Sequence, residues 1–291
     1  MEAIDYYVTP ITPYLICDHF ISTEIHPSEK YIGMPLSLKA NDILKDNSIS
    51  KIQSMDIIQI QVDYFDFFYD KILPILCKRN IKVIIFTSQW HLPQLHRSNK
   101  TDLCLEHPNI LLWISQNPIY KHEKYMAFPY GICQQSIKAY AEFVESNLPV
   151  KDNTLANLHA SVHTHLPPQH IRNQYELFGK NSGPILTYTD YLTQLAKSQF
   201  VISTSGDRDD CYRHYECIGL NTIPVSNITG YEEIFGTNMV YSNAEEMVKM
   251  VHSNTVGTYV PPDKSLLTIA YWVSEINRRS IKLNIILHIF V

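Results

Sequence analysis

The chain has 291 residues, of which 45% are hydrophobic and 18% charged, so it can form two folded domains and is not a disordered protein. Its formal net charge of −5 argues against a nucleic-acid-binding protein, because such proteins carry a broad basic face. The cysteines form no CxxC pair and the N-terminus has no signal-peptide pattern, which predicts reduced thiols and a cytoplasmic protein. The strongest apolar run, residues 281–291, is about half the length that a membrane-spanning helix needs, so no membrane span is expected.

Short apolar runs alternate with helical patterns over the first half of the chain. Strands are predicted at 55–63, 81–89, 109–117 and 124–132. Helices are predicted at 64–80, where Pro74 interrupts the pattern, and at 133–147. Such alternation is typical of βα units and a mainly parallel sheet.

The same alternation follows a predicted linker at 149–153. Strands are predicted at 155–163, 199–204 and 221–226, and helices at 167–180, 188–198, 210–220 and 243–253. The sequence thus predicts an α/β fold with two Rossmann-like domains, residues 1–150 and 151–265. Residues 266–291 are expected to form a C-terminal helix or tail that packs back on the first domain. Ligands of open parallel sheets bind beyond the carboxyl ends of the strands, so polar residues there are the candidates for a site.

The segment "FVISTSGDRDDCYRHYECIGLNTIPVS", residues 200–226, combines a strand, a polar turn and a helix start. Asp209 or Asp210 is the expected cap of that helix, whose free N–H groups attract anions such as a diphosphate. Arg213 and Glu216 are neighbours on one side of the helix. A guanidinium suits phosphate oxygens and a carboxylate suits two ribose hydroxyls, although an intrahelical surface ion pair is the alternative.

This segment resembles the donor-binding signature of exostosin-like glycosyltransferases, including their short bacterial and large-virus members. The residues in register with that signature are Ser203, Gly206, Asp210, Arg213, Glu216, Pro224 and Val225. The segments "VDYFDFFYDKILPIL", "HPNILLWISQNPIYKHEKYMAFPYGI" and "SVHTHLPPQHIRNQYELF" resemble other motifs of the same family in the same order. The resemblance covers about residues 55 to 235. The sequence departs from the signature at two positions, where Thr204 replaces the usual proline and Arg208 the second glycine of the turn.

The resemblance implies a GT-B fold, in which two Rossmann-like domains face a central cleft. It also implies inverting transfer of a sugar from a UDP-sugar to a hydroxyl of a glycan acceptor, without a metal or another cofactor. Xylose is one sugar that fits the family. Arg172, Arg213 and Arg208 would stabilise the charge that develops on the departing diphosphate. The donor site would be completed by His163, Ser203, Ser205, Gly206, Asp210 and Glu216.

Inversion needs a base that takes the proton of the acceptor hydroxyl. This base is expected at the carboxyl end of a strand of the first domain. Asp63 is the first choice and Asp66 the second, although Asp63 could equally cap a helix. His91 has a suitable ordinary pKa, yet beside Trp90 it also fits a packed aromatic side chain. Asp18 and His19 form a further candidate pair.

Two alternatives remain open from the sequence. The first is a metal site among the histidines at 159, 163, 165 and 170, for which no nearby carboxylate completes a set. The second is a catalytically inactive protein of the same fold that binds a glycan or a nucleotide. A nucleotide-sugar epimerase or oxidoreductase is disfavoured, because it needs a GxGxxG fingerprint after the first strand and residues 6–20 supply none.

Overall fold

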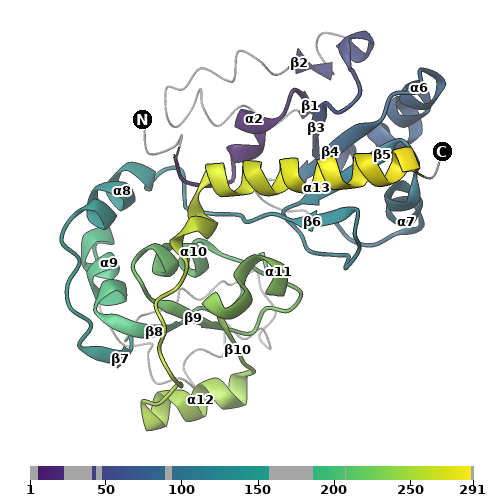
Figure 1. Ribbon diagram of the computed structural model, residues 1–291. Coiled ribbons are helices and arrows are strands. Elements are labelled where there is room, and N and C mark those ends of the chain that lie inside the picture. The colour runs from purple at the N-terminus through teal and green to yellow at the C-terminus, as the bar shows by residue number, and fades with distance from the viewer. Residues whose placement is uncertain are drawn as a thin grey trace. The chain divides into compact units, whose positions relative to one another are not determined.

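Two parallel β-sheets organise the chain, one in each of two units (Figure 1). The N-terminal unit comprises Val8–Pro129 and Ile269–Val291, and the C-terminal unit comprises Tyr130–Thr268 with Met1–Tyr7. The computed structural model describes residues 6–22, 41–43, 48–88, 94–156, 186–206 and 208–289. The predicted α/β class, with one Rossmann-like sheet in each half of the chain, is confirmed.

The sheet of the N-terminal unit has the order β2-β1-β3-β4-β5-β6, and its strand pairs are parallel. Its strands are β1 (His19–Ile21), β2 (Asn41–Asp42), β3 (Ile57–Gln61), β4 (Val83–Ser88), β5 (Ile110–Ser115) and β6 (Tyr125–Ala127). Its helices are α2 (Thr12–Ile16), α5 (Phe65–Phe67), α6 (Leu73–Lys78), α7 (Asn99–Glu106) and α13 (Ile269–Ile289), with 3-10 turns η1 (Ser48–Lys51) and η2 (Val62–Tyr64). Strands β4 and β5 are buried along their whole length, which explains their mainly apolar sequences.

The helix predicted over residues 64–80 is present, but a π-helical turn, η3 (Phe68–Ile72), joins α5 to α6. This turn ends just before Pro74, which lies in the first turn of α6. Proline has no N–H to donate, and a π-turn changes the local hydrogen-bond pattern without ending the helix. The helix therefore continues past Pro74. It buries Phe65, whose ring stacks on Trp113 with centroids 5.2 Å apart.

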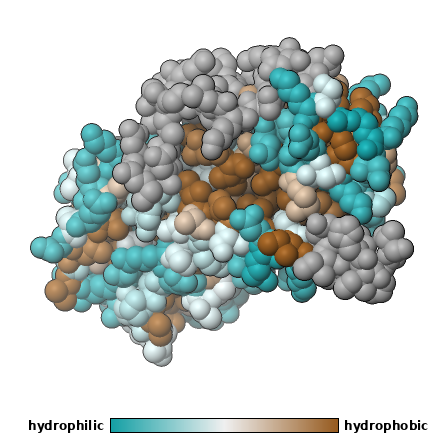
Figure 2. Space-filling model, turned by 45° about the horizontal axis from the view of Figure 1, so that its top comes forward, coloured by the Kyte–Doolittle hydropathy of each residue, from teal (hydrophilic) through white to brown (hydrophobic). Residues whose placement is uncertain are grey.

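The helix α13 packs on β5 of the N-terminal unit (Figure 1). Trp272 on α13 is buried against Phe128, with ring centroids 5.4 Å apart, and Phe128 in turn contacts Phe86 on β4 at 4.8 Å. Within the described residues, no helix is both long and apolar enough to cross a membrane. Figure 2 shows one face of the molecule, on which hydrophobic and hydrophilic residues are both exposed.

The sheet of the C-terminal unit has the order β10-β9-β8-β7, again with parallel pairs. Its strands are β7 (Asn153–Leu155), β8 (Ser198–Ile202), β9 (Ile223–Ser226) and β10 (Val240–Tyr241). Its helices are α8 (Ile137–Glu145), α9 (Tyr188–Ala196), α10 (Tyr212–Gly219), α11 (Glu232–Phe235) and α12 (Ala244–Ser253), with 3-10 turns η5 (Gly236–Asn238) and η6 (Lys264–Leu267). The helix predicted at 167–180 lies outside the described residues.

The change from one unit to the other falls at Tyr130, earlier in the chain than the predicted boundary near residue 150. The reason is that α8 packs with α9 and α10. The Tyr140 hydroxyl donates to the Glu216 carbonyl oxygen at 3.0 Å. A Cβ at position 219 would lie 1.9 Å from that hydroxyl, so the close approach of α8 requires Gly219. The six cysteines are free thiols, and Cys17, Cys104 and Cys217 are buried.

The Lys151 side chain, just before β7, forms hydrogen bonds with the ends of neighbouring helices and strands. Its Nζ donates to the carbonyl oxygens of Ala196, Ser198 and Leu220 at 3.0, 2.6 and 3.2 Å, and lies 3.0 Å from Thr222 Oγ1. Lys151→Met keeps most of the apolar stem but leaves these carbonyl groups without the ammonium donor. We expect the free energy of unfolding, measured with urea, to fall by about 2 kcal/mol.

Lys197→Met is the matched control. The Lys197 side chain is 42% exposed, and its ammonium lies 3.9 Å from the Asp152 carboxylate. Such a pair contributes less than about 1 kcal/mol, so this variant should stay close to the wild type. Equal stability of the two variants would show that the Lys151 hydrogen bonds do not stabilise the unit.

Candidate functional site

The loop after β8 lies at the carboxyl end of the C-terminal sheet, where the sequence predicts donor binding. Ser203, Ser205 and Gly206 are buried in it. The Ser205 backbone N–H donates to Asn227 Oδ1 at 3.0 Å, and Asn227 Nδ2 donates to Ser205 Oγ at 3.3 Å. The Gly206 N–H donates to the Arg208 carbonyl oxygen at 2.8 Å. The loop is therefore tied both to the end of β9 and to itself.

Arg208 and Asp210 form a buried charged pair inside this loop. Their side chains are 6% and 0% exposed, and Arg208 Nε lies 3.8 Å from Asp210 Oδ1. The guanidinium also lies over the ring of Tyr130, 4.5 Å from its centroid. Asp210 accepts hydrogen bonds from the hydroxyls of Tyr215 at 2.5 Å and Tyr231 at 3.3 Å. Both predicted donor residues thus lie in one buried cluster of charged and tyrosine side chains.

The predicted helix cap was wrong. Helix α10 begins at Tyr212, and its N-cap is Cys211 rather than Asp209 or Asp210. The Cys211 N–H donates to His214 Nδ1 at 3.0 Å, and His214 Nε2 lies 2.7 Å from Ser226 Oγ. Because Asp210 is bound by tyrosine hydroxyls, its carboxylate does not fill the N-cap position. Removing a carboxylate from the cap removes one repulsion between the helix start and an anion.

Arg213 and Glu216 lie on α10 as predicted, but they are not a surface ion pair. Glu216 is buried, and its carboxylate accepts from the Tyr188 hydroxyl at 2.9 Å and the Tyr191 hydroxyl at 2.8 Å. Arg213 is partly exposed, and its guanidinium lies 5.5 Å from the centroid of the Tyr191 ring. Arg213 Nη1 also lies 3.5 Å from the Ile202 carbonyl oxygen, at the end of β8. The cation is therefore held at the strand end, beside a buried carboxylate.

Tyr188 and Tyr191 are functional candidates that the sequence reasoning missed. Their rings stack with centroids 6.0 Å apart on α9, and both hydroxyls point to Glu216. A tyrosine pair at i and i+3 on a helix was the available signal, but nothing in the sequence linked it to Glu216. At the start of α10, Tyr130 stacks on Tyr212 with ring centroids 5.2 Å apart.

Burial raises the pKa of Glu216, while the tyrosine hydroxyls and Arg213 oppose this effect. A carboxyl whose pKa is raised in the folded state stabilises the fold below its ordinary value of 4.5, and loses that contribution as pH rises through the folded pKa. Glu216→Gln removes this dependence. We therefore expect the variant to gain stability relative to the wild type as pH rises from about 4.5, in urea unfolding at a series of pH values.

Glu245→Gln should show the opposite trend. Glu245 is an exposed residue of α12 in the same unit, and Lys249, 2.7 Å away, lowers its pKa. Its contribution is present above the ordinary pKa of 4.5 and is lost as pH falls below that value, so this variant should lose stability relative to the wild type as pH rises toward about 4.5. The same sign for both variants would contradict the assigned effect of burial on Glu216.

The predicted bases Asp63 and Asp66 differ in their surroundings. Asp63 is exposed just beyond β3, inside η2, and its Oδ2 accepts from Gln61 Nε2 at 3.0 Å. Since Tyr64 is the N-cap of α5, the alternative that Asp63 caps this helix does not hold. Asp66 is 71% exposed and lies 3.1 Å from Lys100 Nζ, which also binds Asp70.

Asp18 and His19 are not the base and orienting carboxylate that their adjacency suggested. His19 Nε2 lies 2.7 Å from Asp56 Oδ2, and Asp18 accepts from the Ile57 N–H at 2.9 Å. His19 is the first residue of β1, so this pair lies at the amino end of the sheet. Ligand sites of parallel sheets lie at the opposite edge, so the pair is a structural contact.

The remaining predicted residues, His91, His163 and Arg172, lie outside the described residues, as does the histidine group at 159–170. Within the described part of the chain, no group of three or more His, Cys, Asp and Glu side chains could hold a metal ion.

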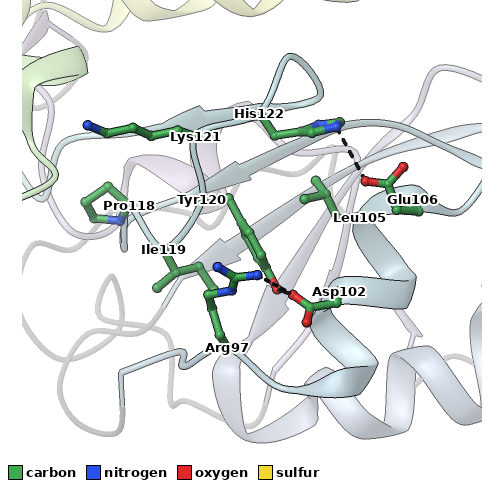
Figure 3. A pocket seen from close by; sticks show the side chains of 9 residues that line it. All are labelled: Arg97, Asp102, Leu105, Glu106, Pro118, Ile119, Tyr120, Lys121 and His122. Atoms are coloured by element: carbon green, nitrogen blue, oxygen red, sulfur yellow. Dashed lines mark hydrogen bonds and ion pairs between the residues drawn. The ribbon is translucent and has the colours of Figure 1, made fainter.

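A pocket of about 590 Å³ opens in the N-terminal unit beside α7 (Figure 3). Its charged groups are largely paired with one another. Arg97 Nη2 lies 3.1 Å from Asp102, which also accepts from the Tyr120 hydroxyl at 2.7 Å, and His122 Nε2 lies 3.5 Å from Glu106 (Figure 3). None of the residues lining this pocket is one of the predicted site residues.

No family model and no curated protein matches the chain. Solved structures give distant similarities. One of them, described as trehalose-6-phosphate from E. coli bound with UDP-2-fluoro glucose, is 14% identical, with 84% of this chain and 72% of that chain covered and a TM-score of 0.39. An apo structure of OtsA gives the same identity, coverage and TM-score. A structure from work on trehalose-6-phosphate synthase with bisubstrate glycomimetics is 12% identical, with the same coverage and a TM-score of 0.37.

Proposed function

We propose that the chain is a glycosyltransferase of GT-B type that transfers a sugar from a UDP-sugar to a hydroxyl of a glycan acceptor. The supporting observation is the carboxyl end of β8, where Arg213 lies on the first turn of α10 next to the buried carboxylate of Glu216. An arginine beside a helix start binds a diphosphate through paired donors and the helix dipole. The resemblance to exostosin-like glycosyltransferases supports the same role for this segment.

We propose that Glu216 orients the nucleotide through its ribose hydroxyls. Tyr188 and Tyr191 hold the carboxylate at a fixed position, and each carboxylate oxygen has lone pairs for more than one donor. Arg208 lies in the same loop, paired with the Asp210 carboxylate, and is a further cation that we propose to stabilise the departing diphosphate on the basis of the resemblance. His163 and Arg172 are further proposed donor-binding residues on the basis of the resemblance.

The proposed reaction inverts the anomeric carbon and uses no metal. The Asp63 carboxylate takes the proton of the acceptor hydroxyl, and the acceptor oxygen forms a bond to the anomeric carbon. The bond from that carbon to the diphosphate oxygen breaks on the opposite face, and UDP leaves with the electron pair. Arg213 stabilises the negative charge that develops on UDP. A small pentose such as xylose is the proposed sugar.

A catalytically inactive nucleotide-binding or glycan-binding protein is the second candidate. It is favoured by the fact that Arg208 and Glu216 already have protein partners, which also fits purely structural roles. A protein of this kind would be stabilised by UDP but would not turn over a donor.

Thermal unfolding with UDP, GDP and CMP sugars, each with and without EDTA, tests the proposal together with a turnover assay on the same donors. We expect stabilisation by UDP compounds that EDTA does not remove, and release of UDP in the presence of a glycan acceptor. Stabilisation without turnover would support the second candidate. A strict metal requirement would contradict the proposed mechanism.

A further inference from the structure

We propose that Gln61 is a positioning residue for Asp63, and that Ser22 and Tyr14 hold Gln61 in place. The inference rests on the proposed function, because it assigns a task to side chains around the proposed base. All four residues belong to the N-terminal unit.

A chain of hydrogen bonds leads from α2 to Asp63 at the carboxyl edge of the sheet. The pairing of Ile21 with Ile60 in the parallel strands β1 and β3 places Ser22 beside Gln61. The Tyr14 hydroxyl lies 3.1 Å from Ser22 Oγ, and Ser22 Oγ donates to Gln61 Oε1 at 3.0 Å. Gln61 Nε2 then donates to Asp63 Oδ2 at 3.0 Å.

This chain determines which way the Gln61 amide points. Because Oε1 accepts from the Ser22 hydroxyl, Nε2 is the atom turned toward Asp63. A flipped amide would place its oxygen against the carboxylate, and both atoms are acceptors. Gln61 is 5% exposed, and burying an amide costs free energy unless both of its ends are hydrogen-bonded. An apolar side chain at position 61 would pack in the strand without needing hydrogen bonds, so the glutamine here indicates a role for its amide.

The geometry suits a residue that orients a base. Asp63 is exposed, while the amide that holds its Oδ2 is buried behind it. A general base must present its oxygen to the substrate hydroxyl at hydrogen-bond distance, and small misplacements reduce the rate strongly. Gln61 restricts the rotation of the carboxylate from the protein side.

Gln59 provides a matched control on the same strand. It is fully buried two residues earlier on the same face of β3, and its Nε2 donates to Ser88 Oγ at 3.1 Å. Its Oε1 has no hydrogen-bond partner, and no bond of Gln59 leads to Asp63 among the contacts of the described residues. Gln59→Leu and Gln61→Leu therefore make the same chemical change in similar surroundings, and only the second removes a donor to Asp63.

We expect Gln61→Leu to lower kcat of sugar transfer about tenfold, with the KM for the donor and the affinity for UDP unchanged. Tyr14→Phe should lower kcat about twofold to threefold, because it acts through Ser22 and Gln61. Gln59→Leu should keep the wild-type kcat. A wild-type kcat for Gln61→Leu, or an equal loss in Gln59→Leu, would overturn the assignment.

A measurement without turnover separates this inference from the proposed function. The side-chain amide resonances of Gln61, observed by NMR in the full chain, should move in Asp63→Ala and stay in place in Asp66→Ala. Unchanged resonances in Asp63→Ala would overturn the positioning role. If the wild-type protein transfers no sugar from any donor, the proposed function is wrong, and Gln61 has no role in catalysis. The NMR resonances would still show whether the Gln61 amide binds the Asp63 carboxylate.

Discussion

Arg213→Ala is expected to lower kcat/KM of sugar transfer by about 10²-fold to 10³-fold, the cost of losing one donor to a charge that develops in the transition state. The affinity for UDP, measured by calorimetry, should fall as well, because the guanidinium also contacts the diphosphate in the ground state. Arg213→Lys should recover part of the loss, since an ammonium keeps the charge but not the paired donors.

Lys249→Ala is the control for a general loss of positive charge. Lys249 lies on α12 of the same unit and pairs with Glu245 at the exposed surface. This variant should keep wild-type kinetics and UDP affinity. Full transfer and full UDP affinity in Arg213→Ala would show that Arg213 does not bind the diphosphate.

Asp63→Asn is expected to lower kcat by about 10²-fold to 10⁴-fold, the usual contribution of a general base. The affinity for UDP should not change, because the proposed nucleotide site lies in the other unit. The measurement is steady-state transfer with separate calorimetric titration of UDP.

Asp66→Asn provides the comparison within the same segment. Asp66 is bound to Lys100 at an exposed position, and the ion pair contributes little to stability. We expect this variant to retain most of the activity. If Asp66→Asn were the inactive one and Asp63→Asn active, the base would be Asp66 and the role of Gln61 would be lost.

The sheets could be predicted from the sequence because their central strands are buried on both faces. The runs 83–86 and 110–114 are apolar without interruption, and strands of a parallel sheet have this pattern. The predicted segments match β3, β4, β5, β8 and β9 to within a few residues. The position of Arg213 and Glu216 on one helix followed from their spacing alone.

The contacts of the site could not be predicted, because they depend on residues distant in the sequence. The position of Asp210 in the sequence is typical of a helix cap, but its carboxylate is buried and accepts hydrogen bonds from the Tyr215 and Tyr231 hydroxyls. The Glu216 carboxylate accepts hydrogen bonds from two tyrosines of α9. The His19 ring is hydrogen-bonded to Asp56 rather than to the adjacent Asp18. Local patterns indicate which residues are polar near a strand end, whereas their partners are decided by the tertiary fold.

The domain boundary illustrates the same limit. The linker predicted near residue 150 has the proline and polar residues typical of a connection. The structure nevertheless joins α8 to the C-terminal unit, because Gly219 allows Tyr140 to approach α10. Contacts of α8 with α9 and α10, which come later in the chain, thus place the boundary at Tyr130.

The position of α13 has a consequence for the order in which the protein folds during synthesis. Its Trp272 and Ile276 are buried, and the helix packs on β5, which is made more than a hundred residues earlier. The strands of the N-terminal unit therefore leave the ribosome before α13 has been made, so part of their sheet is at first uncovered. Most of the C-terminal unit is synthesised between these two parts of the N-terminal unit. During translation chaperones can bind this uncovered surface, and it can also cause aggregation. The N-terminal unit is completed only after the C-terminal unit has been synthesised.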